Sequence, residues 1–179
     1  MKHVENLEEV PKSNNHAYHH TDGTYIEDII NSGLISNNKN KEWEKINEFL
    51  HMVAEKENIS NIPKDRSKCN FLFPRFNDIR DSECVIVVNL KKEKPRDIYR
   101  GSYHTVTEIH DIICKEKSMS SAEDIIETKD MDKNSQEAYE LSVQYWSNMS
   151  KENLPIDKGG ELLIPGDIKP ESITHVYRK

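Results

Sequence analysis

Two polar clusters lie on strand-like segments that are otherwise apolar, and their residue types are suited to chemistry. The first is Tyr18–Thr21, which contains His19 and His20. Because successive side chains of a strand point to opposite faces, only one of these histidines can face a given side of a sheet. Such a histidine is either a half-buried structural residue or a hydrogen-bonding group that faces a cleft.

The second cluster is Glu161, the first residue of the apolar segment Glu161–Ile164, which follows Gly159 and Gly160 directly. A glutamate in this place either lies at a solvent-exposed strand edge or points its carboxylate into a cleft. The local pattern alone favours the strand edge. The absence of side chains on the two glycines would let this backbone approach a ligand closely.

Several common signatures of catalysis are absent from the sequence, including GxGxxG, the Walker loop, HExxH and GxSxG. His16 and His20 can share one strand face, but no carboxylate or cysteine pattern joins them. Cys69, Cys84 and Cys114 form no CxxC pair, and we expect them to be small buried hydrophobic residues. The sequence therefore predicts neither a metal site nor a disulfide framework.

The charge of the chain is unevenly distributed along its 179 residues. The net charge of −7 argues against non-specific binding of nucleic acid over the whole surface. Residues 64–100 contain ten lysines and arginines against six acidic residues, which gives this basic zone a charge of +4 and leaves −11 elsewhere. The basic zone either serves an anionic ligand or is an ordinary solvated face.

Length and hydropathy bound the class of protein. The length predicts one domain, residues 15–179, after a flexible lead-in at 1–14 that contains Pro11. No run approaches the roughly 20 apolar residues of a membrane helix, and the N-terminus lacks the apolar stretch of a secretory signal. We therefore expect a cytoplasmic protein with reduced thiols and no membrane partner, of undetermined oligomeric state.

Hydrophobic periodicity places the polar clusters in a mixture of strands and helices. Strands are expected at His16–His20, 70–73, Cys84–Leu90, 97–99, Glu161–Ile164 and Ile173–Tyr177, and helices at 25–32, 41–57 and after Thr105, Ser120 and Asn134. The Cys84–Leu90 segment is β-branched and continuously apolar, as in a central strand. Because strands and helices do not alternate regularly, the sequence predicts an α+β fold.

Three segments in this order resemble the ADP-ribosyltransferase fold. Tyr18–Ile35 is similar to the YHxT…ILxxGL opening of that family, and Glu161–Ile173 resembles its late strand, which carries the catalytic glutamate. Between them, Phe71–Arg75 resembles the FYFxPRSPM segment of the DNA-modifying (DarT-like) ADP-ribosyltransferase toxins, with Phe76–Asp78 replacing Ser-Pro-Met. The resemblance implies two small packed β-sheets with flanking helices and an NAD cleft between them.

The resemblance also implies an activity, the transfer of ADP-ribose from NAD to a macromolecular acceptor without a metal. The acceptor implied by the nearest motif is a nucleic-acid base, in a single-stranded nucleic acid. The implied site residues are Glu161 and Arg75 for catalysis, and Tyr18, His19, Thr21, Tyr25 and Phe73 for NAD binding.

The roles that the resemblance implies for these residues suit the chemistry of NAD cleavage, which passes through an oxocarbenium-like ribose. Glu161 would stabilise the developing positive charge, and His19 would hydrogen-bond a ribose hydroxyl. Thr21 would contact the nicotinamide amide, Phe73 or Tyr25 would stack on its ring, and Arg75 would hold the pyrophosphate or position the target base.

Three other functions remain open from the sequence. Water could be the acceptor, which would make the protein an NAD glycohydrolase. The fold could instead bind an NAD-derived nucleotide without turnover, or serve only as a structural partner-binding protein. His19 and Glu161 together favour an enzyme. Tyr145 and Trp146, on the helix after Asn134, are expected to pack in the core. Phe71 and Phe73 have core packing as their alternative role, and Arg75 an ordinary surface position.

Overall fold

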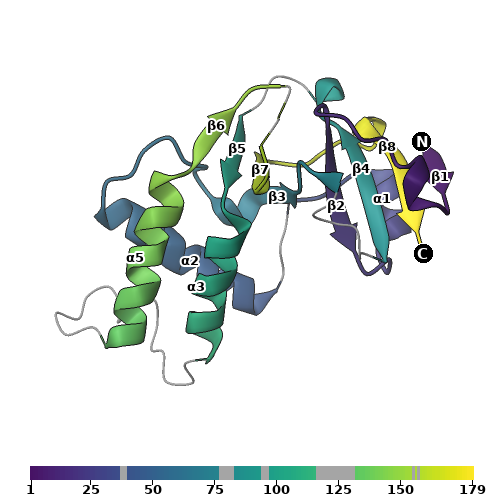
Figure 1. Cartoon of the computed structure of the whole chain (residues 1–179). Helices are drawn as coiled ribbons and strands as arrows, with labels where there is room; N and C mark the ends of the chain where they lie inside the picture. Colours follow the sequence, from purple (N-terminus) through teal and green to yellow (C-terminus); the bar gives the residue numbers. More distant parts are fainter. Residues whose placement is uncertain (37–39, 77–82, 94–96, 116–131, 155, 157) are drawn as a thin grey trace.

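The computed structural model describes the chain except residues 37–39, 77–82, 94–96, 116–131, 155 and 157 (Figure 1). The described residues form an α+β fold with two four-stranded sheets, which confirms the predicted fold class. The first sheet has the order β1 (Lys2–Val4), β8 (Ile173–Arg178), β4 (Cys84–Asn89) and β2 (His16–Thr21). The second has the order β3 (Cys69–Leu72), β7 (Glu161–Pro165), β5 (Ile98–Gly101) and β6 (Ser150–Glu152).

Strand β4 is the centre of the first sheet, as its apolar run predicts. It pairs antiparallel with both β2 and β8, and its side chains from Cys84 to Val88 are all buried. Val85 and Val87 pack on one face with Tyr18, while Ile86 and Val88 pack on the other. Both faces are therefore covered, which explains the absence of the polar alternation typical of a half-exposed strand.

The N-terminal residues belong to this sheet, contrary to the expectation of a flexible lead-in. Strand β1 pairs in parallel with β8, and Val4 and Val10 are buried. The Tyr18 hydroxyl donates a hydrogen bond of 2.8 Å to the Pro11 carbonyl, which holds the segment against β2. An edge strand needs only a few apolar contacts. The polar composition of residues 1–14 therefore gives no indication of this strand.

The two sheets meet where β2 passes the end of β3. Tyr18 and Phe73 exchange backbone hydrogen bonds of 2.9 and 2.7 Å in an isolated antiparallel bridge. One hydrophobic cluster joins residues of both sheets with helix α1 (Ile26–Ser32), including Ala17, Leu72 and Leu162. This shared core fixes β2, which carries Tyr18, His19 and Thr21, relative to β7, which carries Glu161, and to β3, after which Phe73 follows directly.

A separate group of helices packs at the far side of the second sheet (Figure 1). It contains α2 (Lys41–Lys56), α3 (Tyr103–Lys115) and α5 (Lys133–Ser147) around its own apolar cluster. Helix α5 is capped by Asp132, whose carboxylate accepts hydrogen bonds from the backbone amides of Asn134 and Ser135. This cap lies two residues before the predicted cap, Asn134. The helix expected after Ser120 lies outside the described residues.

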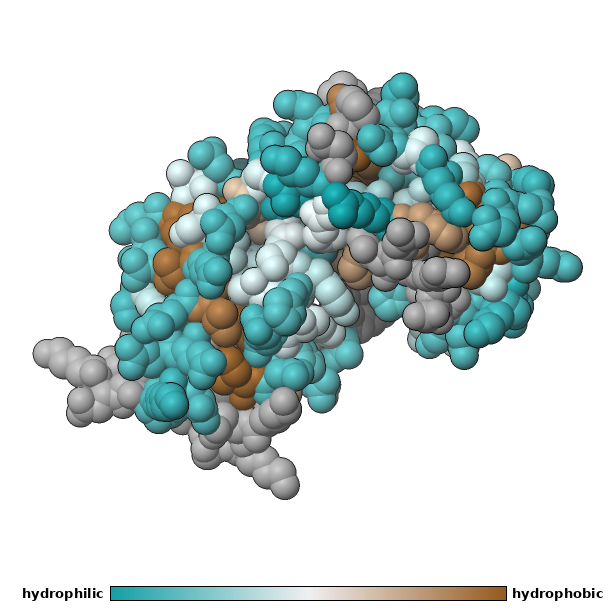
Figure 2. Space-filling view, in the orientation of Figure 1, coloured by the Kyte–Doolittle hydropathy of each residue, from teal (hydrophilic) through white to brown (hydrophobic). Residues whose placement is uncertain are grey.

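The surface visible in Figure 2 is mostly hydrophilic, with apolar side chains confined to small patches. Among the described helices, none has both the length and the apolar character that crossing a membrane requires.

Candidate functional site

A pocket of about 250 Å³ opens where the two sheets meet the helical group. Its walls come from β2, from β3 and the residue after it, from the 3-10 turn Arg66–Lys68, from the first residue of β7 and from the beginnings of α2 and α3. The lining residues are His19, His20, Trp43, Arg66, Phe71, Leu72, Phe73, Tyr103 and Glu161. Aromatic rings thus form much of the wall, and one carboxylate and one guanidinium lie among them.

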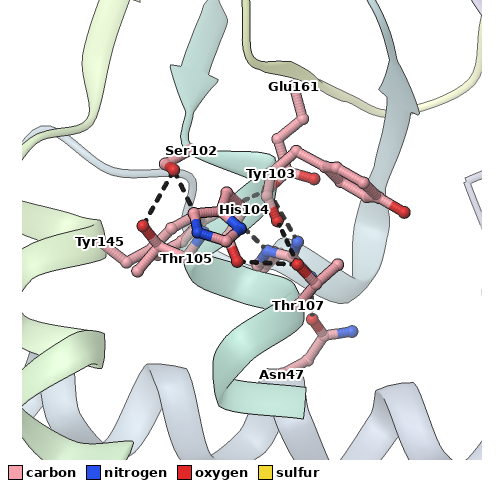
Figure 3. Close-up of polar contacts among 9 residues, drawn as sticks. Asn47, Ser102, Tyr103, His104, Thr105, Thr107, Tyr145 and Glu161 are labelled. Atoms are coloured by element: carbon pink, nitrogen blue, oxygen red, sulfur yellow. Dashed lines mark hydrogen bonds and ion pairs between the residues drawn. The ribbon is translucent and has the colours of Figure 1, made fainter. Parts of the chain in front are cut away.

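Glu161 is buried inside the second sheet, and the expectation that it lies at a solvent-exposed edge is wrong. Its strand lies between β3 and β5, and only 3% of the residue is exposed. Two donors reach the same carboxylate oxygen, Oε1: Arg66 Nη2 at 3.0 Å and the Tyr145 hydroxyl at 2.7 Å. Figure 3 shows Glu161 and Tyr145 approaching this point from different elements, above Asn47.

Arg66 is the centre of this buried polar cluster. Nη1 donates to Asn47 Oδ1 at 2.6 Å and Nε donates to the Tyr145 hydroxyl oxygen at 3.0 Å, while the guanidinium lies 4.4 Å from the Phe71 ring centre. The guanidinium therefore links α2, α5 and β7, and all of its recorded polar contacts lie in the interior.

The protonation states within the cluster follow from burial and charge. Burial acts to lower the pKa of Arg66, but Tyr145 and Glu161 raise it above its ordinary value. Burial raises the pKa of Tyr145 well above its ordinary value; the charge of Arg66 opposes this effect and Glu161 adds to it. At neutral pH Arg66 is therefore cationic and Tyr145 neutral, and both donate a hydrogen bond to Glu161 Oε1.

Gly160 shapes the backbone at the start of β7. Its φ of +118° lies in the region that favours glycine, and a Cβ there would come within 2.5 Å of the Gly101 carbonyl oxygen. The glycine therefore allows a close approach between β7 and β5, where Glu161 pairs with Gly101. The close approach that Gly160 allows is therefore to the neighbouring strand β5, where a ligand had been expected.

His19 faces the pocket from β2 and is held by β3. Its Nδ1 lies 3.0 Å from the Phe71 carbonyl oxygen, which can only accept, so Nδ1 carries the hydrogen and Nε2 is an acceptor. Burial lowers the pKa of His19, with a smaller opposing effect of the Phe71 hydrogen bond. At neutral pH the pocket therefore contains an uncharged imidazole with one nitrogen able to accept a hydrogen bond.

Stability is expected to fall as the solution becomes more acidic than pH 6.5, the ordinary histidine pKa. The pKa of His19 is lowered in the folded chain, so the unfolded chain binds its proton first. The stability that this neutral histidine contributes is complete above pH 6.5 and is lost as the pH falls through the folded pKa. Burial also lowers the pKa of His51, so this residue contributes to the pH dependence of stability with the same sign.

Urea unfolding between pH 8 and 5 measures this dependence. His19→Gln should flatten the fall in unfolding free energy below about pH 6.5, the titration range of a free histidine. His104→Gln, at an exposed position on α3, is measured alongside as the control for replacement of a histidine by glutamine. Equal slopes in the wild type and the His19 variant would contradict the neutral, buried assignment.

The pocket gathers only some of the residues that the sequence predicts. His19, Phe73 and Glu161 line it. Tyr18 lies on the opposite face of β2, where it is buried in another apolar cluster, and Thr21 pairs with Cys84 at the end of the strand.

Two further predicted residues are exposed and do not line the pocket. The Tyr25 residue is 61% exposed at the start of α1. Arg75 is also exposed, and its guanidinium lies close to Gly159, just before the strand that carries Glu161. Arg75 is thus near the site in space, without forming its wall.

The most important residues that sequence reasoning missed are Arg66, Tyr145 and Asn47. Arg66 was counted in the basic zone, but it is 2% exposed and its charge is compensated by Glu161. Tyr145 does pack in the core, as expected, yet its hydroxyl reaches across to Glu161. No local pattern marks Arg66, because its partners are 19, 79 and 95 residues away.

Comparisons with known protein families, with curated proteins and with solved structures each found no match.

Proposed function

We propose that this chain binds NAD in the pocket and transfers its ADP-ribose to a macromolecular acceptor. The observation that carries the proposal is the buried Glu161 carboxylate, held by Arg66 and Tyr145 in the wall of an aromatic pocket. Burial of a charged group is costly, and such groups occur more often where a site uses them. The motif resemblance supplies the substrate, and the geometry described above is compatible with it.

The carboxylate would act on the ribose. Among the described residues, both recorded donors to Glu161 bind Oε1, so Oε2 is the oxygen that can accept a hydrogen bond from a ribose hydroxyl. As the bond to nicotinamide breaks, positive charge develops on the ribose, and a fixed carboxylate stabilises that charge. Arg66 and Tyr145 would keep the carboxylate in one orientation, so that it need not reorganise during the reaction.

The pocket walls would position the nicotinamide end of the substrate. The centre of the Phe73 ring lies 5.7 Å from that of His20 and 5.1 Å from that of Tyr103. Flat apolar rings of this kind pack against a flat aromatic ligand. Nε2 of His19 would accept a hydrogen bond from a ribose hydroxyl. A pocket of about 250 Å³ is smaller than most cofactor sites, so we expect only part of NAD to be enclosed.

The acceptor is proposed to be a nucleic-acid base outside the enclosed part of the pocket. Arg66 does not contribute to this interaction, since its charge is internal. Arg75, Lys91 and Lys92 are exposed cations of the basic zone that can attract phosphates. If water is the acceptor instead, the same pocket makes the protein an NAD glycohydrolase. If no bond breaks, it is a binder of NAD-derived nucleotides.

Incubation of the full chain with NAD separates these alternatives. We expect NAD at about 100 times its dissociation constant to stabilise the fold by about 2.7 kcal/mol, visible as a higher melting temperature. With single-stranded DNA, RNA and protein supplied separately, mass spectrometry should find the mass of ADP-ribose added to a nucleic acid, together with free nicotinamide.

Each outcome of this experiment has a distinct meaning. Free ADP-ribose without an adduct would identify a glycohydrolase, and a thermal shift without nicotinamide release would identify a non-catalytic binder. An adduct found on protein alone would retain the transferase activity and exclude the nucleic-acid acceptor. No thermal shift at millimolar NAD would contradict the proposal as a whole.

A further inference from the structure

A second group of reactive side chains lies away from the pocket, where α2 and α3 face each other. Glu42 comes from the first turn of α2, and His110 and Cys114 lie four residues apart on α3. One ligand atom from each of the three lies within 4.8 Å of the others. Cys114 is exposed, which corrects the expectation that all three cysteines are buried, whereas Cys69 and Cys84 are buried as expected.

The distances in this group are close to those of a tetrahedral metal centre. His110 Nε2 lies 3.6 Å from Cys114 Sγ and 3.8 Å from Glu42 Oε2. Zinc bonds of about 2.3 Å to sulfur and 2.0 to 2.1 Å to nitrogen or oxygen place tetrahedral ligand atoms roughly 3.4 to 3.6 Å apart. The histidine and cysteine already have this spacing, and the carboxylate of the exposed Glu42 lies slightly farther from the imidazole.

The His110 ring is held in the orientation that a metal ligand needs. It lies against Trp43, with ring centres 4.8 Å apart and planes inclined by 33°. Its second nitrogen, Nδ1, lies 3.6 Å from Asp111 Oδ1 on the other side. A carboxylate near the outer nitrogen of a metal-bound histidine is a common arrangement, because it orients the ring and makes the bound nitrogen more basic.

We propose that Glu42, His110 and Cys114 form a binding site for a thiophilic divalent cation of the zinc type. One thiolate, one imidazole and one carboxylate suit zinc, and a water molecule would complete the tetrahedron. Harder cations such as Mg²⁺ favour all-oxygen ligands and are not expected to bind here. This cation site does not rest on the proposed transferase activity.

The bound cation would link two helices that also form the pocket. Trp43, which follows Glu42 on α2, lines the pocket, and Tyr103 at the beginning of α3 lines it as well. A cation held by both helices would restrain these two walls relative to each other. Metal binding is therefore expected to raise the melting temperature as well as to order this part of the pocket.

Titration of the reduced, chelator-treated full chain with Co²⁺ tests the site directly. We expect one Co²⁺ per chain, a thiolate-to-metal charge-transfer band in the near ultraviolet, and displacement of both by Zn²⁺. Cys114→Ser should abolish the band. His110→Asn and Glu42→Gln should each weaken Zn²⁺ binding at least about tenfold, the loss that follows removal of even an outer partner of a metal ligand.

His104→Asn provides the matched control. His104 lies on the same helix, and its Nε2 is 3.3 Å from Glu108 Oε1, but among the described residues no cysteine joins that pair. This variant should bind Co²⁺ like the wild type. The proposal is overturned by absence of the charge-transfer band, by its persistence in Cys114→Ser, or by one metal per two chains, which would indicate a contact between copies. All of these surface variants should fold.

Discussion

Replacement of Glu161 by glutamine is expected to lower kcat about a hundredfold or more, which corresponds to about 2.7 kcal/mol of transition-state stabilisation. Glutamine keeps the shape and can still accept hydrogen bonds from Arg66 and Tyr145, but it carries no charge. If the carboxylate acts on the developing positive charge, its loss affects the transition state more than the ground state. The affinity for NAD should therefore change little. His19→Ala, by contrast, should mainly weaken NAD binding.

The matched control is Glu152→Gln in the same sheet. Glu152 also pairs with an arginine, Arg100, at 2.8 Å, but it does not line the pocket. Its replacement should leave kcat and KM near their wild-type values. Both variants need unfolding curves, with rates measured well below their melting temperatures, since Glu161→Gln also removes the counter-charge of Arg66. A folded Glu161→Gln variant with near-normal turnover would refute catalysis by this carboxylate.

Replacement of Arg66 by methionine is expected to lower the free energy of unfolding by about 3 to 5 kcal/mol, because it leaves the Glu161 carboxylate buried without its cation. The side chains of this pair are 2% and 4% exposed, so water compensates little for the loss. Asn47 Oδ1 and the Tyr145 hydroxyl each lose a donor as well. Chemical denaturation at pH 7 measures the change.

The double variant Arg66→Met, Glu161→Gln distinguishes a lost charge pair from a packing defect. Since both charges are then absent, it should recover a large part of the stability, with an interaction energy of about 1 to 3 kcal/mol between the two sites. Arg100→Met is the control for arginine replacement, and the more accessible Arg100–Glu152 pair should cost only about 1 kcal/mol. Additive losses in the double variant would show that Arg66 and Glu161 do not stabilise each other.

The two effects of Arg66 can also be separated in the activity assay. If Arg66 holds Glu161 in its reactive orientation, the folded fraction of Arg66→Met should have a lower kcat at saturating NAD. An arginine that only supports the fold would reduce the amount of active protein while leaving kcat per folded molecule unchanged. Active-site titration combined with the unfolding curve therefore decides between a positioning role and a purely structural one.

The elements with strong local patterns were predictable from the sequence. The continuous β-branched run of β4 requires burial on both faces, and the structure places it at the centre of the first sheet. The apolar spacing from Trp43 to Val53 produces α2, with its inner side chains in the helical core. In both cases residues close in sequence provide the periodicity, so no distant partner is needed to recognise the element.

Short polar elements could not be predicted in this way. Strands β1 and β6 lie at sheet edges and contain few apolar residues, and each is defined by hydrogen bonds to a distant strand. The segments that pair with them, β8 and β5, are far away in the sequence. Their existence is therefore a consequence of the completed sheet.

For the candidate site, the sequence determined which residues are chemically able to act, and the tertiary structure decided which of them meet. His19, Phe73 and Glu161 were identified from residue type and motif, and they line one pocket. The sequence could not reveal that Arg66 turns inward or that Tyr145 completes the cluster, because a local polar segment looks the same whether it faces water or a buried carboxylate. The burial of an arginine depends on a partner that compensates its charge, and here folding brings that partner from 95 residues away.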